Sequence, residues 1–404
     1  MSGDATAHDL NGNLVNTSFF LSQSKRASYT KSTHSTREQE DTERSVWRSI
    51  FPIDTLPVLD STNHINYLMK GLHELSSGHE SLDASTPWLC FWILHSLEIL
   101  SGPPLSADTK SAVVQTLRHC VDAEFGGYGG GPLQRGHLAT TYAAVCALVT
   151  LGTEEALQSI DILSIKKLIN NVHYSDGSLS LHVDGELDVR AAYCAAVVVR
   201  LLNLDHKLLL SNTPQWVASC QSYDGGFSAL PFTESHGGYT FCSYASLVLL
   251  GHEGLCDISA LIRWVSFRQM SCEGGFSGRP NKLVDGCYSF WQAGVFPLAQ
   301  MAMQLSKHSS FESLLFNQSA LQEYILRCCQ HPRGGFIDKP GTSRDYYHTC
   351  YCLSGLSLAQ SQRLNGLSRQ NTVVGPLENL VAEINPVYNL SVTKLQNAFE
   401  FFAN

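Results

Sequence analysis

The chain has 404 residues, of which 44% are hydrophobic and 16% are charged, a composition that allows a large buried core. Its formal net charge is −9 at pH 7, whereas nucleic-acid-binding proteins are typically basic, so no nucleic acid is expected as a partner. The 13 cysteines stand mostly singly in apolar stretches, which predicts a reducing compartment, the cytoplasm. The longest apolar run, 191–199, has nine residues where a membrane span needs roughly 20, so no membrane span is expected.

The first 45 residues differ in composition from the rest of the chain. They are rich in serine, threonine, asparagine and mixed charges, and they contain few apolar anchors. This pattern predicts a flexible polar N-terminal tail over 1–45, followed by one folded domain over 46–404. The first strong element of that domain is 87–100, which is apolar on every side and is therefore expected to be a helix buried all round.

Glycine-containing turns then recur at an almost constant interval. Their central glycines are separated by 50, 49, 49 and 60 residues, at Gly127, Gly177, Gly226, Gly275 and Gly335. A period of about 50 residues indicates one supersecondary unit that stacks on its neighbours around a continuous core.

Two kinds of segment alternate around these turns. Before each turn lies a segment with one apolar face, at 111–120, 165–172, 213–221, 258–270 and 319–330. After each turn lies a segment of small apolar residues, at 139–151, 189–202, 239–250, 288–298 and 348–359. The first kind suits outer helices and the second suits closely packed inner helices. We therefore expect an all-α fold, an α–α barrel (toroid) of about six repeated helical hairpins.

Every expected inner helix opens with reactive side chains. They are His137, Asp188, Arg190, His236, Asp285, Cys287, Tyr347 and His348. Because the repeats stack in register, these openings are expected on one rim of the barrel. The N-terminal ends of helices carry unpaired N–H groups and a positive dipole end, so they also favour the binding of anions at this rim.

Three of these residues are candidate metal ligands. Asp285, Cys287 and His348 offer a carboxylate, a thiolate and an imidazole, and three protein ligands leave a fourth position open, as in catalytic zinc sites. The alternative is that Cys287 is another buried cysteine and His348 a hydrogen-bonded core histidine. Spacing alone leaves both interpretations open, since there is no CxxC or HExxH pattern.

A set of basic residues and a set of aromatic residues accompany the candidate metal ligands. Arg190, His236, Arg279 and Lys282 suggest an anionic ligand such as a diphosphate, although any single cation is more often solvated surface charge. Aromatic residues inside a barrel form either ordinary core or an apolar cavity for a hydrocarbon chain. The residues concerned are Trp88, Trp92, Tyr142, Tyr193, Trp291 and Tyr351.

Several long segments resemble one family. They are DASTPWLCFWILHSLE at 83–98, GGYGGGPLQRGHLATTYAA at 126–144, GELDVRAAYCAA at 185–196, HGGYTFC at 236–242, RPNKLVDGCYSFWQAG at 279–294, DKPGTSRDYYHTCYCLSGLS at 338–357 and NPVYN at 385–389. In this order they resemble the β subunits of protein farnesyltransferases, in the protein prenyltransferase β-subunit family, over roughly residues 60–400.

The resemblance implies an activity and a set of partners. It implies zinc-dependent transfer of a farnesyl group from farnesyl diphosphate to the cysteine thiolate of a C-terminal CaaX motif, in proteins such as small GTPases. It implies one Zn²⁺ ion, assisting Mg²⁺, and a heterodimer with a prenyltransferase α subunit. Apolar residues on the outer helices, such as Trp264 and Phe267, agree with a partner subunit.

The resemblance also implies residue roles. The zinc ligands are Asp285, Cys287 and His348, which with Tyr288 and Lys282 form the catalytic set. The diphosphate-binding residues are Arg190, His236, Arg279, Lys282 and Tyr288. The isoprenoid pocket contains Trp88, Tyr142, Tyr193, Cys242, Trp291 and Tyr351. The substrate tail lies against Ser85, Trp88, Trp92, His137, Ala139 and Tyr347. The magnesium-linked residue is Asp338.

Three rival interpretations make different demands on the sequence. A binding scaffold explains the repeat but gives no reason for Cys287 and His348 at the rim. A terpene cyclase on a similar barrel needs an acidic segment such as DCTAE, and the sequence has none. The geranylgeranyl-transferring sister enzymes have a small residue at the position of Trp88 and a lysine at that of Asp338, so both positions favour farnesyl transfer.

Overall fold

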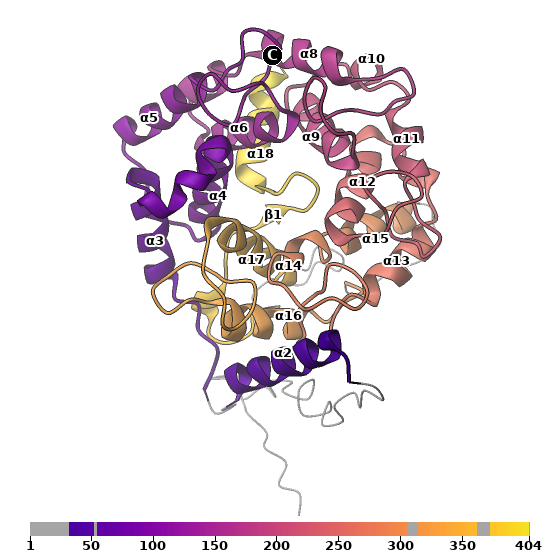
Figure 1. Cartoon of the computed structure of the whole chain (residues 1–404). Coiled ribbons are helices and arrows are strands. Elements are labelled where there is room, and N and C mark those ends of the chain that lie inside the picture. Colours follow the sequence, from indigo (N-terminus) through magenta and orange to yellow (C-terminus); the bar gives the residue numbers. More distant parts are fainter. Residues whose placement is uncertain (1–31, 52–54, 306–313, 362–371, 404) are drawn as a thin grey trace, which may run out of the picture.

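Two concentric rings of helices make up the fold, seen end-on in Figure 1. The computed structural model describes residues 32–51, 55–305, 314–361 and 372–403. The inner ring contains α4 (Thr86–Ile99), α6 (Leu138–Leu151), α9 (Val189–Leu201), α12 (Gly237–Leu250), α14 (Tyr288–Trp291) with α15 (Val295–Leu305), and α17 (Tyr346–Ala359). The outer ring contains α3 (Ser61–His73), α5 (Ala107–Arg118), α8 (Ile162–Val172), α11 (Thr213–Ser219), α13 (Ile258–Ser266) and α16 (Gln318–Tyr324). Successive inner helices pack on one another and α17 packs on α4, which closes the ring and confirms the α–α toroid.

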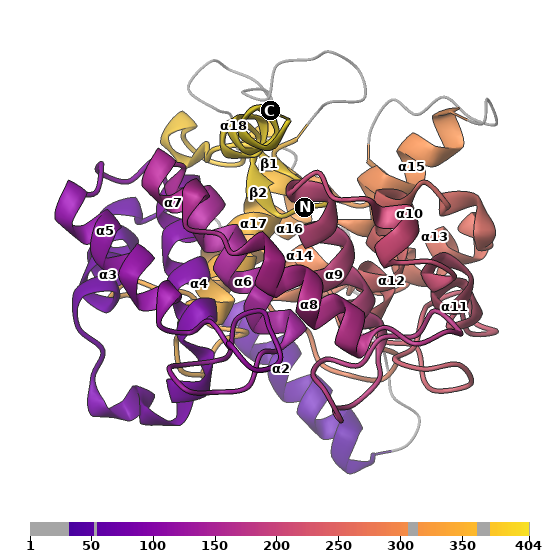
Figure 2. The same cartoon turned by 90° about the horizontal axis from the view of Figure 1, so that it is seen from above.

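Shorter elements connect the rings and cover one end. The connecting elements are α7 (Glu154–Gln158), α10 (His206–Leu209), the 3₁₀ helices η1 (Ser77–Ser85), η2 (Glu253–Leu255) and η5 (Leu377–Asn379), and a π-helical turn η3 (Ile325–Cys329). An antiparallel hairpin of β1 (Ile384–Asn385) and β2 (Leu390–Ser391) leads into α18 (Val392–Phe402). Figure 2 shows this C-terminal segment at one end of the ring. The Tyr193 hydroxyl donates to the Val387 carbonyl at 3.0 Å and ties the hairpin to the inner ring.

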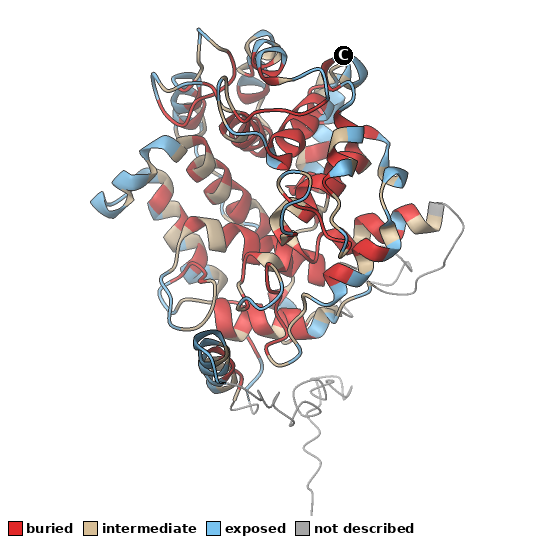
Figure 3. Cartoon of the chain, turned by 45° about the vertical axis from the view of Figure 1, so that its right-hand side comes forward, coloured by how far each residue is buried: buried red, intermediate tan, exposed pale blue. Residues whose placement is uncertain are grey.

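The inner helices are buried on nearly all sides, as their composition predicts (Figure 3). Four of the five expected inner segments agree with the structure to within two residues at each end. The fifth differs, because the helix expected over 288–298 is interrupted between α14 and α15. A Cβ on Gly294 would lie 2.9 Å from the Phe241 ring of α12, so the chain needs glycine where the neighbouring helix approaches. None of the described helices is long and apolar enough to cross a bilayer.

The glycine turns lock each outer helix to the next inner helix. Gly127 has φ +75°, and a Cβ there would lie 2.4 Å from a Leu168 methyl carbon, so the turn requires glycine. The following amide, of Tyr128, donates to the Thr141 hydroxyl at 2.9 Å. The same contact, also at 2.9 Å, recurs between Phe227 and Thr240 and between Phe336 and Thr349. These recurring contacts are the structural basis of the period seen in the sequence.

The domain boundary expected at residue 46 falls inside a helix that packs on the barrel. Helix α2 (His34–Ile50) starts twelve residues earlier, with Thr33 and Thr36 forming a capping box, and it packs against η3 and α16. The polar residues that suggested a tail form one face of this helix, whereas Glu43 and Val46 are buried. Residues 1–31 of the expected tail lie outside the described residues.

Of the two apolar residues expected on the outer surface for a partner subunit, Trp264 is buried. Trp264 of α13 is only 4% exposed, and its indole N–H donates to the Asp224 carboxylate at 2.9 Å, so it belongs to the core of this chain. Phe267 at the end of the same helix is 72% exposed. Only Phe267 therefore remains as an apolar side chain displayed on this outer helix.

Helix α2 is attached through two buried carboxyl groups. Glu43 of α2 and Glu273 of the barrel are 6% and 1% exposed, and the Gln39 amide donates to them at 3.0 and 2.7 Å. Cys272 lies in the same cluster and accepts the Trp47 indole N–H at 3.1 Å. Burial, together with the charge of Glu43, raises the pKa of Glu273 to about 7.

We expect α2 to bind the barrel less tightly as the pH rises from about 5 to 7, because the attached state retains a proton on Glu273 that the detached state releases. Amide hydrogen exchange in α2, corrected for the intrinsic pH dependence, should be faster at the higher pH. Glu273→Gln should remove this pH dependence, and Glu253→Gln in η2 is the matched control. Equal pH dependence in wild type and Glu273→Gln would contradict the assignment.

Candidate active site

Polar residues begin the inner helices because they cap them. In each case a side chain accepts a backbone N–H of the first turn, which satisfies a donor that has no partner within the helix. The capping pairs of α6, α9, α12 and α17 are His137 with Ala139 (3.1 Å), Asp188 with Arg190 (2.7 Å), His236 with Gly238 (3.2 Å) and Asp345 with His348 (2.6 Å). Asp285, two residues before the N-cap of α14, accepts the Cys287 N–H at 2.8 Å. The caps thus have a local role in folding, and the repeat brings them to one rim.

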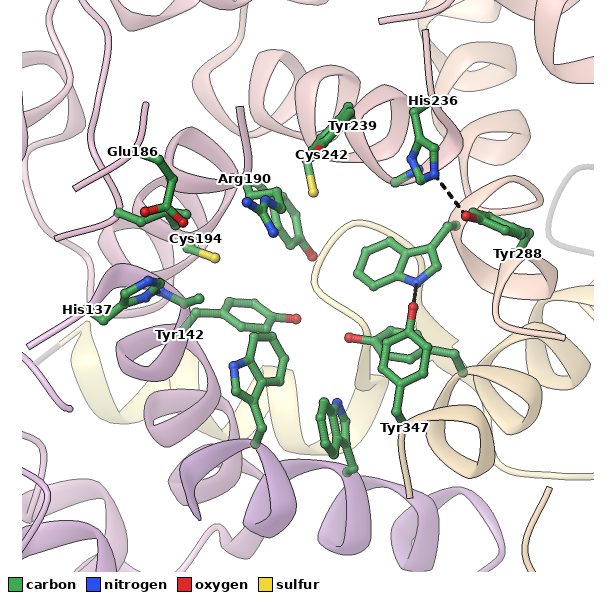
Figure 4. A pocket seen from close by; sticks show the side chains of 18 residues that line it. His137, Tyr142, Glu186, Arg190, Cys194, His236, Tyr239, Cys242, Tyr288 and Tyr347 are labelled. Atoms are coloured by element: carbon green, nitrogen blue, oxygen red, sulfur yellow. Dashed lines mark hydrogen bonds between the residues drawn. The ribbon is translucent and has the colours of Figure 1, made fainter. Parts of the chain in front are cut away.

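A cavity of about 430 Å³ opens at this rim, between the inner helices (Figure 4). Thirteen of the residues expected at the site line it, namely Trp88, Trp92, His137, Ala139, Tyr142, Arg190, Tyr193, His236, Cys242, Tyr288, Trp291, Tyr347 and Tyr351. They come from α4, α6, α9, α12, α14 and α17, or from the N-caps of these helices. The openings of α6, α9, α12 and α17 contribute His137, Arg190, His236 and Tyr347 to this one cavity.

Aromatic rings form the deep wall of the cavity. Tyr142 contacts Trp88 and Tyr193, with ring centroids 5.6 and 5.5 Å apart, and Trp291 contacts Tyr351 at 4.5 Å. Such a wall favours an apolar ligand, while His137, His236 and Arg190 lie at the N-terminal ends of their helices, at the rim. The arrangement suits a molecule with a hydrocarbon body and a charged head.

His236 and Tyr288 form a hydrogen-bonded pair at the mouth, with His236 Nε2 and the Tyr288 hydroxyl 2.9 Å apart (Figure 4). Burial and the neighbouring Arg279 lower the pKa of His236, so the ring is neutral at pH 7. Its Nδ1 accepts the Gly238 amide, which leaves the proton on Nε2. Nε2 therefore donates to the tyrosine oxygen. The Tyr288 O–H remains free to donate to an anion in the cavity, since burial raises its pKa and keeps it protonated.

Beside this pair, the three candidate metal ligands converge. The ligand atoms of Asp285, Cys287 and His348 all lie within 4.8 Å of one another, and His348 Nε2 is 3.3 Å from an Asp285 oxygen. The other ring nitrogen of His348 is 2.6 Å from the Asp345 carboxylate, which fixes the orientation of the ring. Such a carboxylate commonly supports a metal-binding histidine.

The electrostatics of this triad fit a divalent cation. Burial and the charge of Asp285 raise the pKa of the Cys287 thiol to about 12. Although burial disfavours a charged ring, the hydrogen bonds to Asp285, Asp345 and Cys287 raise the pKa of His348 to about 12. Both raised pKa values mean that this cluster of side chains favours an added positive charge. Its sulfur, nitrogen and oxygen donors match a three-ligand zinc site.

Seven expected site residues do not line the cavity, namely the three candidate metal ligands, which lie beside it, and four others. Arg279 pairs with Glu234 but lies near enough to His236 to lower its pKa, and Lys282 is exposed. Ser85 precedes α4 and is half-buried. The fourth is Asp338, whose side chain lies 2.5 Å from the Lys339 ammonium and accepts the Thr342 hydroxyl.

The sequence analysis missed several residues that contribute to the site. Asp345 is the clearest, because it orients His348 and occupies the same capping position as His137, Asp188 and His236 in their repeats. Aligning the repeats would have found it. The cavity also includes Leu181, Glu186, Cys194, Gly238 and Tyr239. Of these, Tyr239 lies beneath the Arg190 guanidinium, 5.8 Å from it.

Comparison with known proteins relates this architecture to one family. Residues 59–390 match the prenyltransferase alpha-alpha toroid domain. The chain is 39% identical to the protein farnesyltransferase subunit beta of Pisum sativum, over 78% of this chain and 89% of that protein. It is 37% identical to the corresponding subunit of Arabidopsis thaliana, over 84% and 81% of the two chains. The structure of Candida albicans protein geranylgeranyltransferase-I complexed with GGPP has the same fold, with a TM-score of 0.69, 21% identity and coverage of 85% of this chain and 98% of that one.

Proposed function

Because the chain belongs to the protein farnesyltransferase β-subunit family, we propose that it transfers a farnesyl group from farnesyl diphosphate to the cysteine of a C-terminal CaaX motif. The observation that carries this proposal is the convergence of Asp285, Cys287 and His348 beside an aromatic cavity with polar groups at its mouth. A hydrocarbon chain suits the wall, and a diphosphate suits the mouth. Thioether formation then requires a thiolate next to the first carbon of the isoprenoid.

Zinc is the proposed cofactor, held by Asp285, Cys287 and His348. When bound there it would lower the pKa of an incoming thiol, so that thiolate is present at neutral pH. Asp345 holds the His348 ring with Nε2 toward the other two ligands. Magnesium is proposed to assist at Asp338. The Lys339 ammonium, which pairs with this carboxylate, would first have to leave it. Asp338 and diphosphate oxygens would then hold the ion.

The departing diphosphate is the main charge that the protein must stabilise. The Tyr288 O–H is available to donate, because His236 already donates to its oxygen. Arg190, Arg279 and Lys282 supply positive charge around this pair, and we propose that they strengthen their contacts as charge builds on the leaving oxygen. Arg279 must exchange its pairing with Glu234 for the diphosphate.

The substrate tail is proposed to enter on the opposite side of the cavity. Ser85, Trp88, Trp92, His137, Ala139 and Tyr347 are the proposed contacts. The Trp291 indole donates to the Tyr347 hydroxyl at 3.1 Å, which holds Tyr347 toward the cavity (Figure 4). The proposed partner is a prenyltransferase α subunit, and the substrates include CaaX-ending proteins such as small GTPases. All 13 cysteines are free thiols, which agrees with action in the reducing cytoplasm.

The proposal is tested by co-expressing the chain with a prenyltransferase α subunit and assaying a CaaX peptide with farnesyl diphosphate. Wild-type complex should form the thioether product. Tyr288→Phe should lower kcat about tenfold, because one hydrogen bond to a developing anion is lost. Tyr223→Phe, at an exposed tyrosine outside the cavity, is the matched control. The assignment fails if the wild-type complex transfers no isoprenoid to the cysteine.

A further inference from the structure

One short segment of backbone, residues 336–338, joins the two repeats that supply the candidate metal ligands. At one end of this segment, the Asp338 carbonyl accepts the Gly286 amide at 2.7 Å. Gly286 stands between Asp285 and Cys287, two of the three ligands, so this bond restrains the loop that carries both. A shift of the Asp338 backbone would therefore move two ligands together.

The other end of the segment reaches the third ligand. The Phe336 carbonyl accepts the Asp345 amide at 3.3 Å, and the Asp345 carboxylate lies 2.6 Å from His348 Nδ1. The Asp338 side chain is paired with Lys339, so its link to the metal ligands runs through the backbone alone. The segment thus restrains all three ligands relative to one another, although its own side chains are not among them.

A buried tyrosine holds this segment in place. Tyr324, the last residue of α16, is fully buried, and its hydroxyl donates to the Asp338 carbonyl at 2.6 Å. This carbonyl therefore accepts two hydrogen bonds, one from Tyr324 and one from Gly286. The chain leaves α16 through the π-helical turn η3, a distortion that is frequent near functional sites.

Packing alone does not explain the Tyr324 hydroxyl. In four of the five glycine turns, a side chain of the next outer helix lies so close to the central glycine that an added Cβ would be 2.4 to 2.7 Å from it. The pairs are Gly127 with Leu168, Gly226 with Trp264, Gly275 with Tyr324 and Gly335 with Tyr67. Leu168 fills this position with no polar atom. A phenylalanine ring would therefore serve the packing at residue 324, and the hydroxyl has another role.

We propose that Tyr324 is a positioning residue for the metal site, whose hydroxyl holds the Asp338 carbonyl, and through it the Gly286 loop, in the arrangement that zinc requires. The inference rests on the zinc site of the proposed function. Supporting groups raise metal affinity by holding the ligands in their binding geometry before the ion arrives. Tyr324 is not itself a ligand, so loss of its hydroxyl should weaken the site without removing a donor atom.

The test measures the zinc affinity of the heterodimer, obtained by co-expression with the α subunit and stripped of metal with a chelator. Tyr324→Phe should raise the dissociation constant for zinc about tenfold, at the lower end of the range for supporting residues. Substitution of Co²⁺ for zinc gives a second readout, because the absorption bands of Co²⁺ depend on the geometry of its ligands. These bands should shift in Tyr324→Phe.

Tyr244→Phe is the matched control. Tyr244 of α12 is also fully buried, but its hydroxyl has no hydrogen-bond partner among the residues that the structure describes. This variant loses the same hydroxyl group from an equally buried ring. Its zinc dissociation constant and its Co²⁺ absorption bands should equal those of wild type.

The outcomes separate a positioning role from a purely structural one. A Tyr324→Phe complex that unfolds at a lower temperature but binds zinc as tightly as wild type would overturn the inference, and so would a variant that does not fold. A wild-type complex that holds zinc but transfers no isoprenoid would overturn only the proposed function, if Tyr324→Phe still weakens zinc binding. A wild-type complex that binds no zinc would overturn both.

Discussion

Cys287→Ala and His348→Ala are each expected to lose bound zinc and to abolish isoprenoid transfer. Each change removes one of three converging ligands, and the loss in zinc affinity should exceed the factor of about 10 to 100 that is typical of changes to supporting residues around a metal. The far-UV circular dichroism should stay close to that of wild type, because stacked helical repeats carry the fold. Metal content per protein and thioether formation are the two measurements.

Cys220→Ala provides the control for a lost buried thiol. Cys220 is fully buried at the end of α11 and its Sγ lies 3.5 Å from the Trp216 carbonyl, on the outer ring. This variant should retain both zinc and activity. The mechanism is wrong if active wild-type protein contains no stoichiometric zinc, or if Cys287→Ala remains active.

Trp88→Thr is expected to shift the donor preference from the fifteen-carbon to the twenty-carbon isoprenoid diphosphate. Trp88 lines the cavity and packs against Trp92 and Tyr142, with ring centroids 5.4 and 5.6 Å apart, so its removal enlarges the apolar space. Forcing one extra isoprene unit against a bulky wall costs roughly 1–3 kcal/mol, equivalent to a factor of about five to 150 in relative kcat/KM. Tyr351→Phe should add to the shift by removing a hydroxyl from the same cavity.

Competition between the two diphosphates, with wild type and variant in parallel, measures this preference. Trp216→Thr on α11 is the control for loss of a tryptophan away from the cavity. A wild-type enzyme that prefers the twenty-carbon donor would contradict the assignment and place the chain with the geranylgeranyl-transferring enzymes.

The sequence predicted the fold well because its signal is local and repeated. Each inner helix shows its burial in its own composition, and each glycine turn marks where an outer helix ends. The interruption between α14 and α15 was not predicted. The close approach of Phe241 to Gly294 comes from another helix, so the residues around Gly294 do not reveal it. Helix α2 was missed for a similar reason, since its polar face hides the contact between Glu43 and the distant Glu273.

The site could be predicted only as far as the repeat constrains it. Residues at or just after a helix cap, such as His236 and Tyr288, lie where the register places them. Lys282 and Asp338 belong to loops whose side-chain directions depend on local pairing, and neither lines the cavity.

Closure of the inner ring has a consequence for synthesis of the protein. Helix α4 packs against α17, and the Ala382 amide donates to the Ile99 carbonyl at 2.9 Å, so partners almost 300 residues apart must meet. His95 of α4 likewise hydrogen-bonds to Asn389, at 3.1 Å. During translation, α4 therefore emerges long before the surface that covers it. The growing chain is a stack of hairpins with one apolar end unpaired, and such contacts between distant segments form slowly. A nascent or truncated chain lacking α17 should therefore be an unusually good substrate for chaperones that bind exposed apolar helices.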